Sequence, residues 1–329
     1  MQSSTRSPPD VDVLIPVRNG ARFLSACLDS VFAQSSPARA VIVVDDGSTD
    51  ETPRVLAEYA ACRPNLQVIR SEARGVSHAR NLALRASEAP FVAFLDSDDV
   101  WHPDKLARQM PLFAPDRPEI GFVHCSFFYI DETGSRIHDD KVIPPRKRGE
   151  IFADLLAGYV LSGSASAVVA RRDLMIEASG FDETLFHGED WDAWLKLARS
   201  SHVDFVPEAL TGIRVHPTSS QRQDSRRRAE TFLFQRLQIV DKWIAQLPVG
   251  ADIIDQCRIE AIRVAIKSAM QLPPRWGLYG RLAASDVPLA RKLFPDRRTY
   301  FRFLGKAAAS AAERRTRKLR GRTHAGGVT

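Results

Sequence analysis

Acidic side chains gather at two points of the chain, each directly after a run of apolar residues. The turn Asp45-Asp46-Gly47-Ser48 follows the apolar run 40–44, and Asp96-Ser97-Asp98-Asp99 follows the apolar run 91–95. A carboxylate fixed at such a turn can accept a hydrogen bond from the N–H of a nucleoside base, or it can cap the next helix. Three acids on one turn repel one another unless a cation lies between them, and carboxylate oxygens are the ligands that Mg²⁺ and Mn²⁺ prefer. The second cluster therefore predicts a metal site, with a solvated helix-capping turn as the alternative.

A third acidic group opens a predicted helix at Glu189-Asp190-Trp191-Asp192. A positioned carboxylate can act as a general base toward a hydroxyl, which contributes about 10²–10⁴-fold to the rate of such a step. Acids also favour the N-terminal end of a helix dipole without any catalytic role. Trp194, Leu195 and Leu197 recur at the spacing of a core-facing helix side, so the helix has a structural role under either interpretation.

The elements that carry these groups alternate between strands and helices in the first hundred residues. Short apolar runs predict strands, and apolar positions at helical spacing predict the segments between them as helices. The strands are expected at 11–17, 40–44, 66–70 and 91–95, and the helices at 21–34, 52–61 and 76–86. This alternation is typical of an α/β domain with a mostly parallel sheet. Ligands bind beyond the carboxyl ends of such strands, which is where the first two acidic clusters lie.

The rest of the chain changes character twice. Residues 122–130 and 136–143 predict a β-hairpin, followed by a short helix at 151–156 and a strand at 164–170. A helix at 189–200 and short strands at 203–206 and 211–215 follow. Beyond residue 221 the pattern is all-helical, at 226–246, at 251–271 and in pieces up to 322. We therefore expect a disordered tail at 1–10, a catalytic domain at 11–221, a helical extension at 222–312 and a basic tail at 313–329.

Composition sets limits on the class of protein. The chain has 329 residues, of which 44% are hydrophobic, as expected for a globular protein with a substantial core. Its four cysteines show no metal-binding spacing, which argues against a zinc site or a disulfide framework and indicates a reducing compartment. The sequence predicts neither a secretory signal nor a membrane span, so we expect a cytoplasmic protein.

Residues 11–220 resemble a family-2 glycosyltransferase with a GT-A fold, which is a Rossmann-like sheet flanked by helices. Six stretches in family order carry the resemblance: VDVLIPVRNGARFLSACLDSVFAQ, VIVVDDGSTDET, GVSHARNLAL, FVAFLDSDDVWHPDKL, HGEDWDAWLKLA and RVHPTSSQ. The resemblance implies an inverting enzyme that transfers a sugar from a UDP-, dTDP- or GDP-sugar to a glycan or lipid-linked acceptor. It further implies a role in bacterial surface polysaccharide or cell-envelope synthesis.

The resemblance also implies roles for particular residues in donor binding. Asp46 faces the nucleoside base, and the other donor-binding positions are Pro16, Val17, Asn19, Asp45, Arg80, Asp96 and Ser97. Arg80 would bind the base or the diphosphate, with a structural salt bridge to Asp45 or Asp96 as an equal alternative. Asp98 and His216 are the expected ligands of Mg²⁺ or Mn²⁺, with Asp99 in support.

The catalytic roles that the resemblance implies fall on the third acidic group. Asp190 matches the family's general base, and Glu189 would orient it or contact the acceptor. Ser164 and Ser166 fall where the family lines its acceptor pocket. Asn81 is expected to tie its helix to neighbouring strand ends.

The C-terminal segment has a separate signature. Between Arg291 and Arg322 there are twelve Lys and Arg residues against two acids. Such a run can bind anionic lipids at the inner face of a membrane, or it can be a solvated tail. We expect peripheral membrane contact through this tail and a homodimer through the helical extension, and we expect no nucleic-acid partner.

Three rival functions were weighed. A non-catalytic sugar-nucleotide-binding scaffold would show degraded acidic motifs, yet Asp46, Asp98 and Asp190 are all present. A nucleotidyltransferase would need a glycine-rich phosphate loop with a basic residue near the first strand, which VRNGARF matches poorly. A processive membrane synthase would need transmembrane helices.

Overall fold

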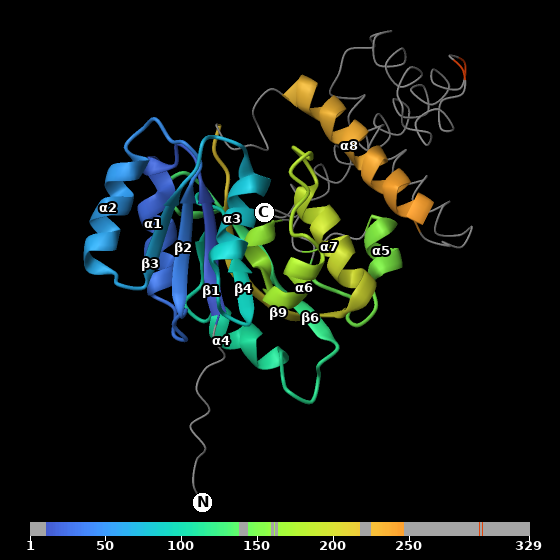
Figure 1. Ribbon diagram of the computed structural model, residues 1–329, viewed down its shortest axis with the longest axis horizontal. Helices are drawn as coiled ribbons and strands as arrows, with labels where there is room; N and C mark the ends of the chain where they lie inside the picture. The colour runs from blue at the N-terminus through green and yellow to red at the C-terminus, as the bar shows by residue number, and fades with distance from the viewer. Residues whose placement is uncertain are drawn as a thin grey trace, which may run out of the picture. The chain divides into compact units, whose positions relative to one another are not determined.

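The computed structural model describes residues 11–137, 144–158, 161, 164–217, 225–246, 296 and 298 (Figure 1). The chain divides into two units, one of residues 1–155 with 159–220 and one of residues 156–158 with 221–329. The elements that position the site all lie in the first unit. In the second unit the described helix is α8, Ser225–Gln246, close to the predicted bounds 226–246.

The first four long strands form the parallel part of the sheet, in the order β3-β2-β1-β4. They are β1 Val11–Val17, β2 Ala40–Asp45, β3 Leu66–Arg70 and β4 Phe91–Phe94. The helices between them are α1 Ala21–Phe32, α2 Thr52–Cys62 and α3 Val76–Ala86. Every residue of β1 is buried, which explains its unbroken apolar sequence. Alternate β1 residues, such as Val13 and Ile15, pack in one core with Leu24 and Leu28 of α1.

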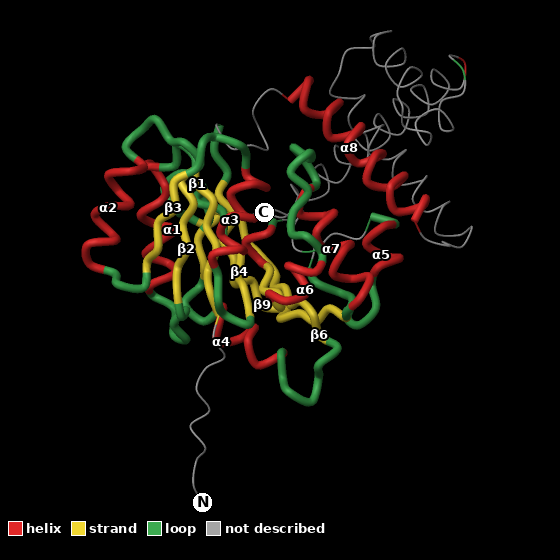
Figure 2. Tube along the Cα trace, in the orientation of Figure 1, coloured by secondary structure: helices red, strands yellow, loops and turns green. Residues whose placement is uncertain are grey.

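The strands of the sheet continue side by side beyond β4 (Figure 2), and in this second half they run in mixed directions. Strand β8 (Val168–Arg171) runs antiparallel to both β4 and β6 (Ile120–Ile130), whereas β9 (His202–Arg214) runs parallel to β6. Two short strands, β5 (Val100–Trp101) and β7 (Arg136–Ile137), pair antiparallel with β9 and β6. The predicted α/β fold is thus confirmed, with the antiparallel pairs confined to this half.

Strand β9 differs from the two short strands predicted at 203–206 and 211–215. It is one strand of thirteen residues, with a register shift after the pair Cys125 and Val206. Pro207 and Glu208 are exposed at that shift, where they interrupt the apolar pattern. The irregularity therefore looked like a gap between strands, although the chain continues along the same edge of β6.

The predicted strand at 164–170 begins as a short 3₁₀-helix at Ala165–Ala167. The Ser164 side chain accepts a hydrogen bond from the amide of Ser166 and caps that turn. The hairpin partner predicted at 136–143 is described at β7 alone, and residues 138–143 lie outside the described part of the chain. The sequence did not predict β5 or the helix α6, Arg172–Glu177.

Helix α7 (Glu189–Ser200) carries the third acidic group and packs on the sheet through Trp194. The Trp194 ring lies 5.7 Å from Phe94 of β4 and 6.1 Å from Phe181, measured between ring centroids. It is also stacked on Phe122 of β6. These contacts bury the side of α7 that was expected to face the core, and they fix where the helix begins.

Two further helices complete the first unit, α4 at Lys105–Gln109 and α5 at Phe152–Leu156. Among the helices that the structure describes, none combines the length and the apolar character that a membrane span requires. The helices predicted at 251–271 and beyond and the basic tail lie outside the described residues, apart from 296 and 298. Of the helical extension predicted to form the dimer, the structure describes α8 and these two residues.

Candidate active site

The turn after β1 and the turn after β2 are tied to each other by side chains. The Asn19 amide donates to Ser48 Oγ at 2.8 Å, and the Thr49 amide donates to Asn19 Oδ1 at 2.8 Å. Asn19 adopts φ 52°, in the left-handed region that asparagine tolerates better than most residues. At the end of β1, the carbonyl of Val17 accepts the amide of Asp46 at 2.8 Å. Pro16, Val17 and Asn19 therefore lie beside the first acidic pair, as predicted.

The side chains of that acidic pair are buried and hold loop backbone. Asp45 Oδ1 accepts the amide of Ser48 at 2.9 Å. Asp46 accepts the amide of Arg74 through Oδ1 at 2.9 Å and that of Gly75 through Oδ2 at 2.7 Å. Gly75 has φ 104°, a conformation that a residue with a Cβ rarely adopts. Asp46 thus shapes the entry to α3, and its contact with a base stays a prediction.

The Asp96–Asp99 turn has two partly exposed carboxylates and one buried carboxylate. The side chains of Asp96 and Asp98 are 30% and 33% exposed, whereas Asp99 is 3% exposed. Asp99 Oδ1 accepts the amide of Arg214 at 2.9 Å, which joins the turn to the end of β9. Burial, followed by repulsion from Asp98 and Asp96, raises the pKa of Asp99 well above its ordinary value. Ser97 lies next to the β1–α1 turn, since a Cβ on Gly20 would come 3.2 Å from Ser97 Oγ.

The two predicted metal ligands are in contact although 118 positions separate them. His216 Nε2 lies 3.0 Å from Asp98 Oδ2, and the imidazole packs against Phe23 with ring centroids 4.7 Å apart. Arg214 Nε donates to the Asp98 carbonyl at 2.8 Å. Burial, and then repulsion from Asp96, raise the pKa of Asp98. A cation bound at Asp98 would relieve that repulsion.

The donor set fits a magnesium or manganese ion that shares its coordination with a diphosphate. No three His, Cys, Asp or Glu side chains converge as metal ligands within the described residues. Mg²⁺ is commonly held by one or two carboxylates, with the remaining positions taken by phosphate oxygens and water. Asp98 and His216 therefore supply a partial site that substrate oxygens would complete.

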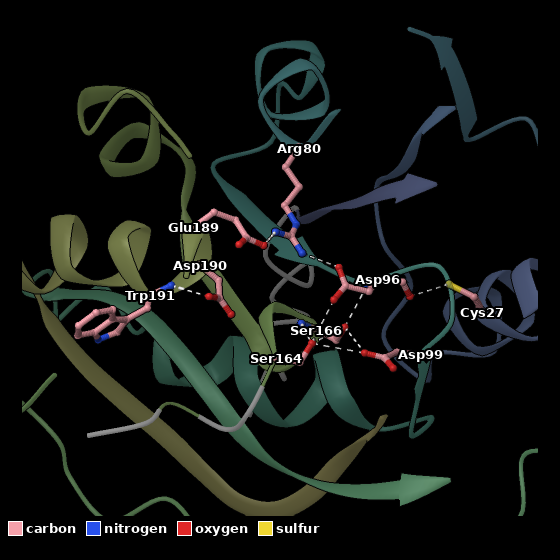
Figure 3. A network of polar contacts seen from close by, with 9 residues as sticks. All are labelled: Cys27, Arg80, Asp96, Asp99, Ser164, Ser166, Glu189, Asp190 and Trp191. Carbon is pink, nitrogen blue, oxygen red and sulfur yellow. Dashed lines mark hydrogen bonds and ion pairs between the residues drawn. The ribbon is translucent and has the colours of Figure 1, made fainter. Parts of the chain in front are cut away.

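Arg80 of α3 joins the acidic turn to the start of α7 (Figure 3). One of its terminal nitrogens donates to Asp96 Oδ1 at 2.6 Å, and the other donates to Glu189 Oε1 at 3.0 Å. Burial lowers the pKa of Arg80, but the charges of Asp96 and Glu189 outweigh this effect, so the net direction is upward. The predicted structural pair with Asp96 is present, and the buried guanidinium spans two parts of the site.

Asp190 is the second residue of α7, and its carboxylate accepts the Trp191 amide at 2.7 Å. Burial, followed by the neighbouring charge of Glu189, raises the pKa of Asp190 to about 6. The positive charge of Arg80 opposes this rise. A base works best when its pKa lies near the working pH, so Asp190 has the acidity expected of a general base at neutral pH.

Ser164 and Ser166 do not line an open pocket as the acceptor prediction required. Ser166 is 0% exposed, and its hydroxyl donates to Asp99 Oδ2 at 2.6 Å (Figure 3). Ser164 is nearly as buried, and its hydroxyl lies 3.3 Å from Asp96 Oδ2 and 3.4 Å from Asp99 Oδ2. The acceptor role of Ser166 is wrong for this arrangement, because no part of its side chain reaches solvent.

One expectation at the site is corrected, and one group was missed in the sequence. Asn81 donates to the carbonyl of Phe181 at 2.8 Å and to Glu183 at 3.0 Å, so it ties α3 to the loop before α7, whereas a tie to strand ends was expected. The missed group is His78. His78 Nδ1 lies 2.9 Å from Glu183 Oε2. These partners are about a hundred positions apart, and no local spacing signals such a pair. Phe23 of α1 packs against His216, and no local spacing relates these two residues.

Comparison with known proteins bears on this geometry. A sequence model described as Glycosyl transferase family 2 matches residues 12–176, half of the chain, including both acidic turns and Arg80. The chain belongs to glycosyl transferase family 2. It is 27% identical over 227 residues to an uncharacterized glycosyltransferase of Rickettsia felis, and 28% identical over 190 residues to chondroitin synthase of Escherichia coli. These matches cover 68% and 58% of this chain, but 37% and 26% of the two relatives.

Solved structures give the same fold at low identity. S. aureus TarS 1–349 in complex with UDP-GlcNAc aligns with a TM-score of 0.58 at 17% identity, covering 92% of each chain. The mannosyltransferase PcManGT of Pyrobaculum calidifontis, in complex with GDP-Man and Mn²⁺, aligns with a TM-score of 0.57 at 20% identity. That alignment covers 93% of this chain and 86% of PcManGT. These likenesses establish the GT-A fold of a family-2 glycosyltransferase.

Proposed function

We propose that this family-2 chain is a metal-dependent, inverting glycosyltransferase that moves a sugar from a nucleoside-diphosphate donor to a hydroxyl of a glycan or lipid-linked acceptor. The observation that carries the proposal is Asp190. Its pKa of about 6 suits proton abstraction at neutral pH. Its chain neighbour Glu189 is bound through Arg80 to the partly exposed carboxylate of Asp96, so the start of α7 that carries Asp190 is tied to the acidic turn.

The donor would bind across the two acidic turns. Asp46, with Asp45 and the β1 end at its side, would recognise the nucleoside. Asp98 and His216 would hold the divalent cation beside the diphosphate, where a bound cation neutralises the charge of the departing group. The neighbour PcManGT is described with GDP-Man and Mn²⁺, and TarS with UDP-GlcNAc, which supports a donor of this class.

The transfer would be a single displacement. The acceptor oxygen forms a bond to the anomeric carbon while the bond from that carbon to the diphosphate oxygen breaks. Asp190 takes the proton of the attacking hydroxyl, and the nucleoside diphosphate leaves with the bonding electron pair. Glu189, held by Arg80 at 3.0 Å, would keep the start of α7 in place during this step.

The class of acceptor is supported by relatives that build polysaccharides. The E. coli relative is chondroitin synthase, and a putative teichuronic acid biosynthesis glycosyltransferase of Bacillus subtilis is 39% identical over 107 residues. A growing surface polysaccharide therefore fits best as the acceptor. Contact of residues 313–329 with a membrane, a cytoplasmic location and a dimer through residues 222–312 belong to the same proposal.

Donor binding is tested by calorimetry with UDP, GDP, dTDP and CMP, with and without Mn²⁺. We expect one diphosphate to bind tightly with Mn²⁺ and the Asp98→Ala variant to lose the metal-dependent gain. Asp104→Ala is a suitable control, because Asp104 is exposed and bonds Ser35 outside the site. Absence of binding to the wild type in every condition would contradict the donor site.

Turnover is tested with Asp190→Asn, which should lower kcat by about 10²–10⁴-fold while nucleotide affinity is kept. Asp173→Asn is the matched control, since Asp173 also lies in the first turn of a helix and accepts the next amide, at 2.8 Å from Leu174. Tight nucleotide binding with no turnover in the wild type, against all acceptors, would favour the scaffold function.

A further inference from the structure

Ser166 occupies the centre of the polar network beneath the acidic turn. Its hydroxyl accepts the amide of Asp96 at 3.0 Å and donates to Asp99 Oδ2 at 2.6 Å, so one oxygen atom holds both ends of the turn (Figure 3). The hydroxyl of Ser164 also donates to the Ser166 hydroxyl, at 3.1 Å. Because these contacts are buried, water does not compete with them.

The backbone of Ser166 is fixed from the opposite side. Trp101 Nε1 donates to the Ser166 carbonyl at 2.8 Å, and the Trp101 ring is 4% exposed. Thr211 Oγ1 of β9 lies 3.3 Å from the same carbonyl. Trp101 and Thr211 therefore hold the backbone of Ser166 in place, and this fixes the position of the hydroxyl that binds the acidic turn.

We infer that Ser166 is a positioning residue that sets the geometry of the partly exposed carboxylates of Asp96 and Asp98 for the cation and the diphosphate. Asp99, held by Ser166, accepts the Arg214 amide, and Arg214 Nε in turn binds the Asp98 carbonyl. A hydroxyl with no exposed surface thus controls the distance between Asp98 and His216. This inference rests on the proposed function for its ligand, and it replaces the acceptor role predicted for Ser166.

The chain offers a matched control at the far end of β1. Ser87 is also buried, and its hydroxyl donates to the buried carboxylate of Asp12 at 2.7 Å. Ser87→Ala and Ser166→Ala each remove one buried hydrogen bond from serine to aspartate. Ser166→Ala also removes the acceptor of the Asp96 amide and of the Ser164 hydroxyl. A purely structural role for Ser166 predicts that both variants lose stability and that neither loses the gain in nucleotide affinity from Mn²⁺.

The first experiment measures nucleotide affinity by calorimetry with and without Mn²⁺. We expect Ser166→Ala to reduce the gain from Mn²⁺ by about 10–100-fold, as loss of a group that orients a metal ligand does. Its metal-free affinity should match that of Ser87→Ala. An unchanged gain from Mn²⁺ in Ser166→Ala, or an equal loss in Ser87→Ala, would overturn the inference.

A second experiment needs no nucleotide and separates this inference from the proposed function. Amide hydrogen exchange at Asp96 should accelerate in Ser166→Ala, because its acceptor is removed, and exchange at residues 97–99 should follow. Ser87→Ala should leave these amides unchanged. Unchanged exchange at residues 96–99 in Ser166→Ala contradicts the inference even if the wild type binds no donor, whereas lack of donor binding alone contradicts the proposed function.

Discussion

Arg80 lies between two carboxylates that come from different parts of the chain, Asp96 at the end of β4 and Glu189 at the start of α7. Its charge also lowers the pKa of Asp190, which burial and Glu189 raise. A buried arginine in this position therefore tunes a base that it does not touch. The function of Arg80 in the proposed reaction is electrostatic as well as structural.

Replacement of Arg80 should move the pH dependence of transfer. Asp190 acts as a base when deprotonated, so kcat/KM should rise as the pH increases through about 6. In Arg80→Met the opposing charge is absent, the pKa of Asp190 rises and the acid limb shifts to higher pH. In Arg80→Lys the shift should be smaller. A pH profile of kcat/KM from pH 5 to 9 measures this.

Arg117→Met is the control, because Arg117 bonds the buried Asp204 at 2.7 Å outside the site. Its acid limb should stay where that of the wild type lies. If both arginine variants move the limb equally, the shift reports general destabilisation instead of the local charge.

At the residue scale the sequence predicted which side chains meet, but not what each one binds. Asp98 and His216 were expected together, and they lie 3.0 Å apart. Asp46 was expected to face a base, yet its two oxygens accept the amides of Arg74 and Gly75. A spacing pattern places a carboxylate at a strand end, whereas its hydrogen-bond partners depend on a loop 28 positions away.

At the scale of elements, the loop between α6 and α7 is anchored on α3. Gly180 has φ 61°, and a Cβ on it would come 2.3 Å from Asn81 Oδ1. Asn81 Oδ1 also accepts the Phe181 amide at 2.8 Å. The side chain of Asn81 therefore occupies the space that a larger residue at position 180 would need.

Gly180→Ala should lower the free energy of unfolding by more than the ~1–2 kcal/mol that a left-handed conformation costs a residue with a Cβ. It should also lower kcat, because displaced Asn81 no longer holds the loop that leads to Asp190. Gly149→Ala is the control, since Gly149 has φ 78° with nothing within 4 Å of its Cβ position. Urea denaturation measures the free energy of unfolding of both variants. Equal losses in Gly180→Ala and Gly149→Ala would argue against a steric role of Asn81.

Lys105 of α4 presents a buried amine that has no hydrogen-bond partner among the residues the structure describes, and this amine lies 4.0 Å from the centroid of the Trp101 ring. Burial lowers the pKa of Lys105 from 10.5 to about 8. The unfolded chain binds more protons than the folded chain between these values, so the free energy of unfolding should increase as the pH rises from about 8 to about 10.5.

Lys105→Met should remove this rise and increase the free energy of unfolding at pH 7 by about 1–3 kcal/mol, because it relieves the burial of a charge. The gain is reduced by the lost cation–π contact with Trp101. Urea denaturation of wild type and variant at pH 7 and pH 10 checks this. The exposed Lys147, changed to Met, should alter neither value, and a lower stability of Lys105→Met at pH 7 would refute the prediction.

Strands β1, β2 and β4 were predictable because each is a short apolar run with nearly every residue buried. Strand β3 is buried at Leu66 and mostly exposed beyond it. The strands of the second half were harder to predict because their sequences do not form such unbroken apolar runs. Strand β9 contains the exposed Pro207 and Glu208, and β5 has two residues, so neither shows a period that a local reading can recognise. Pairing with β6 and β9 itself, not local preference, defines these strands.

At the scale of the whole molecule, the residues of the proposed site all belong to the unit formed by residues 1–155 and 159–220. Asp46, Asp98 and Asp190 come from three separate regions of that unit. Asp46 follows strand β2, Asp98 lies in the turn after β4, and Asp190 lies in the first turn of α7.

A protein that ends at residue 221 should keep metal-dependent nucleotide affinity within about threefold of the full chain, since one tenfold step would correspond to 1.4 kcal/mol of lost contacts. Transfer to the acceptor is the property we expect the shorter protein to lose. Calorimetry and a transfer assay on both proteins measure this. A loss of nucleotide binding on truncation would assign part of the donor site to the C-terminal unit.

The amide contact of Asp190 has a consequence for experiments in cells. Its carboxylate accepts the Trp191 amide of its own helix, and the asparagine oxygen in Asp190→Asn can accept the same bond. Such a variant would be catalytically inactive but correctly folded, and it would still bind the donor and its protein partners. When it is expressed together with the wild-type enzyme, it should act as a dominant-negative allele if the enzyme works in a multiprotein complex with a limited number of places. It should act as a recessive allele if the enzyme works free of such a complex.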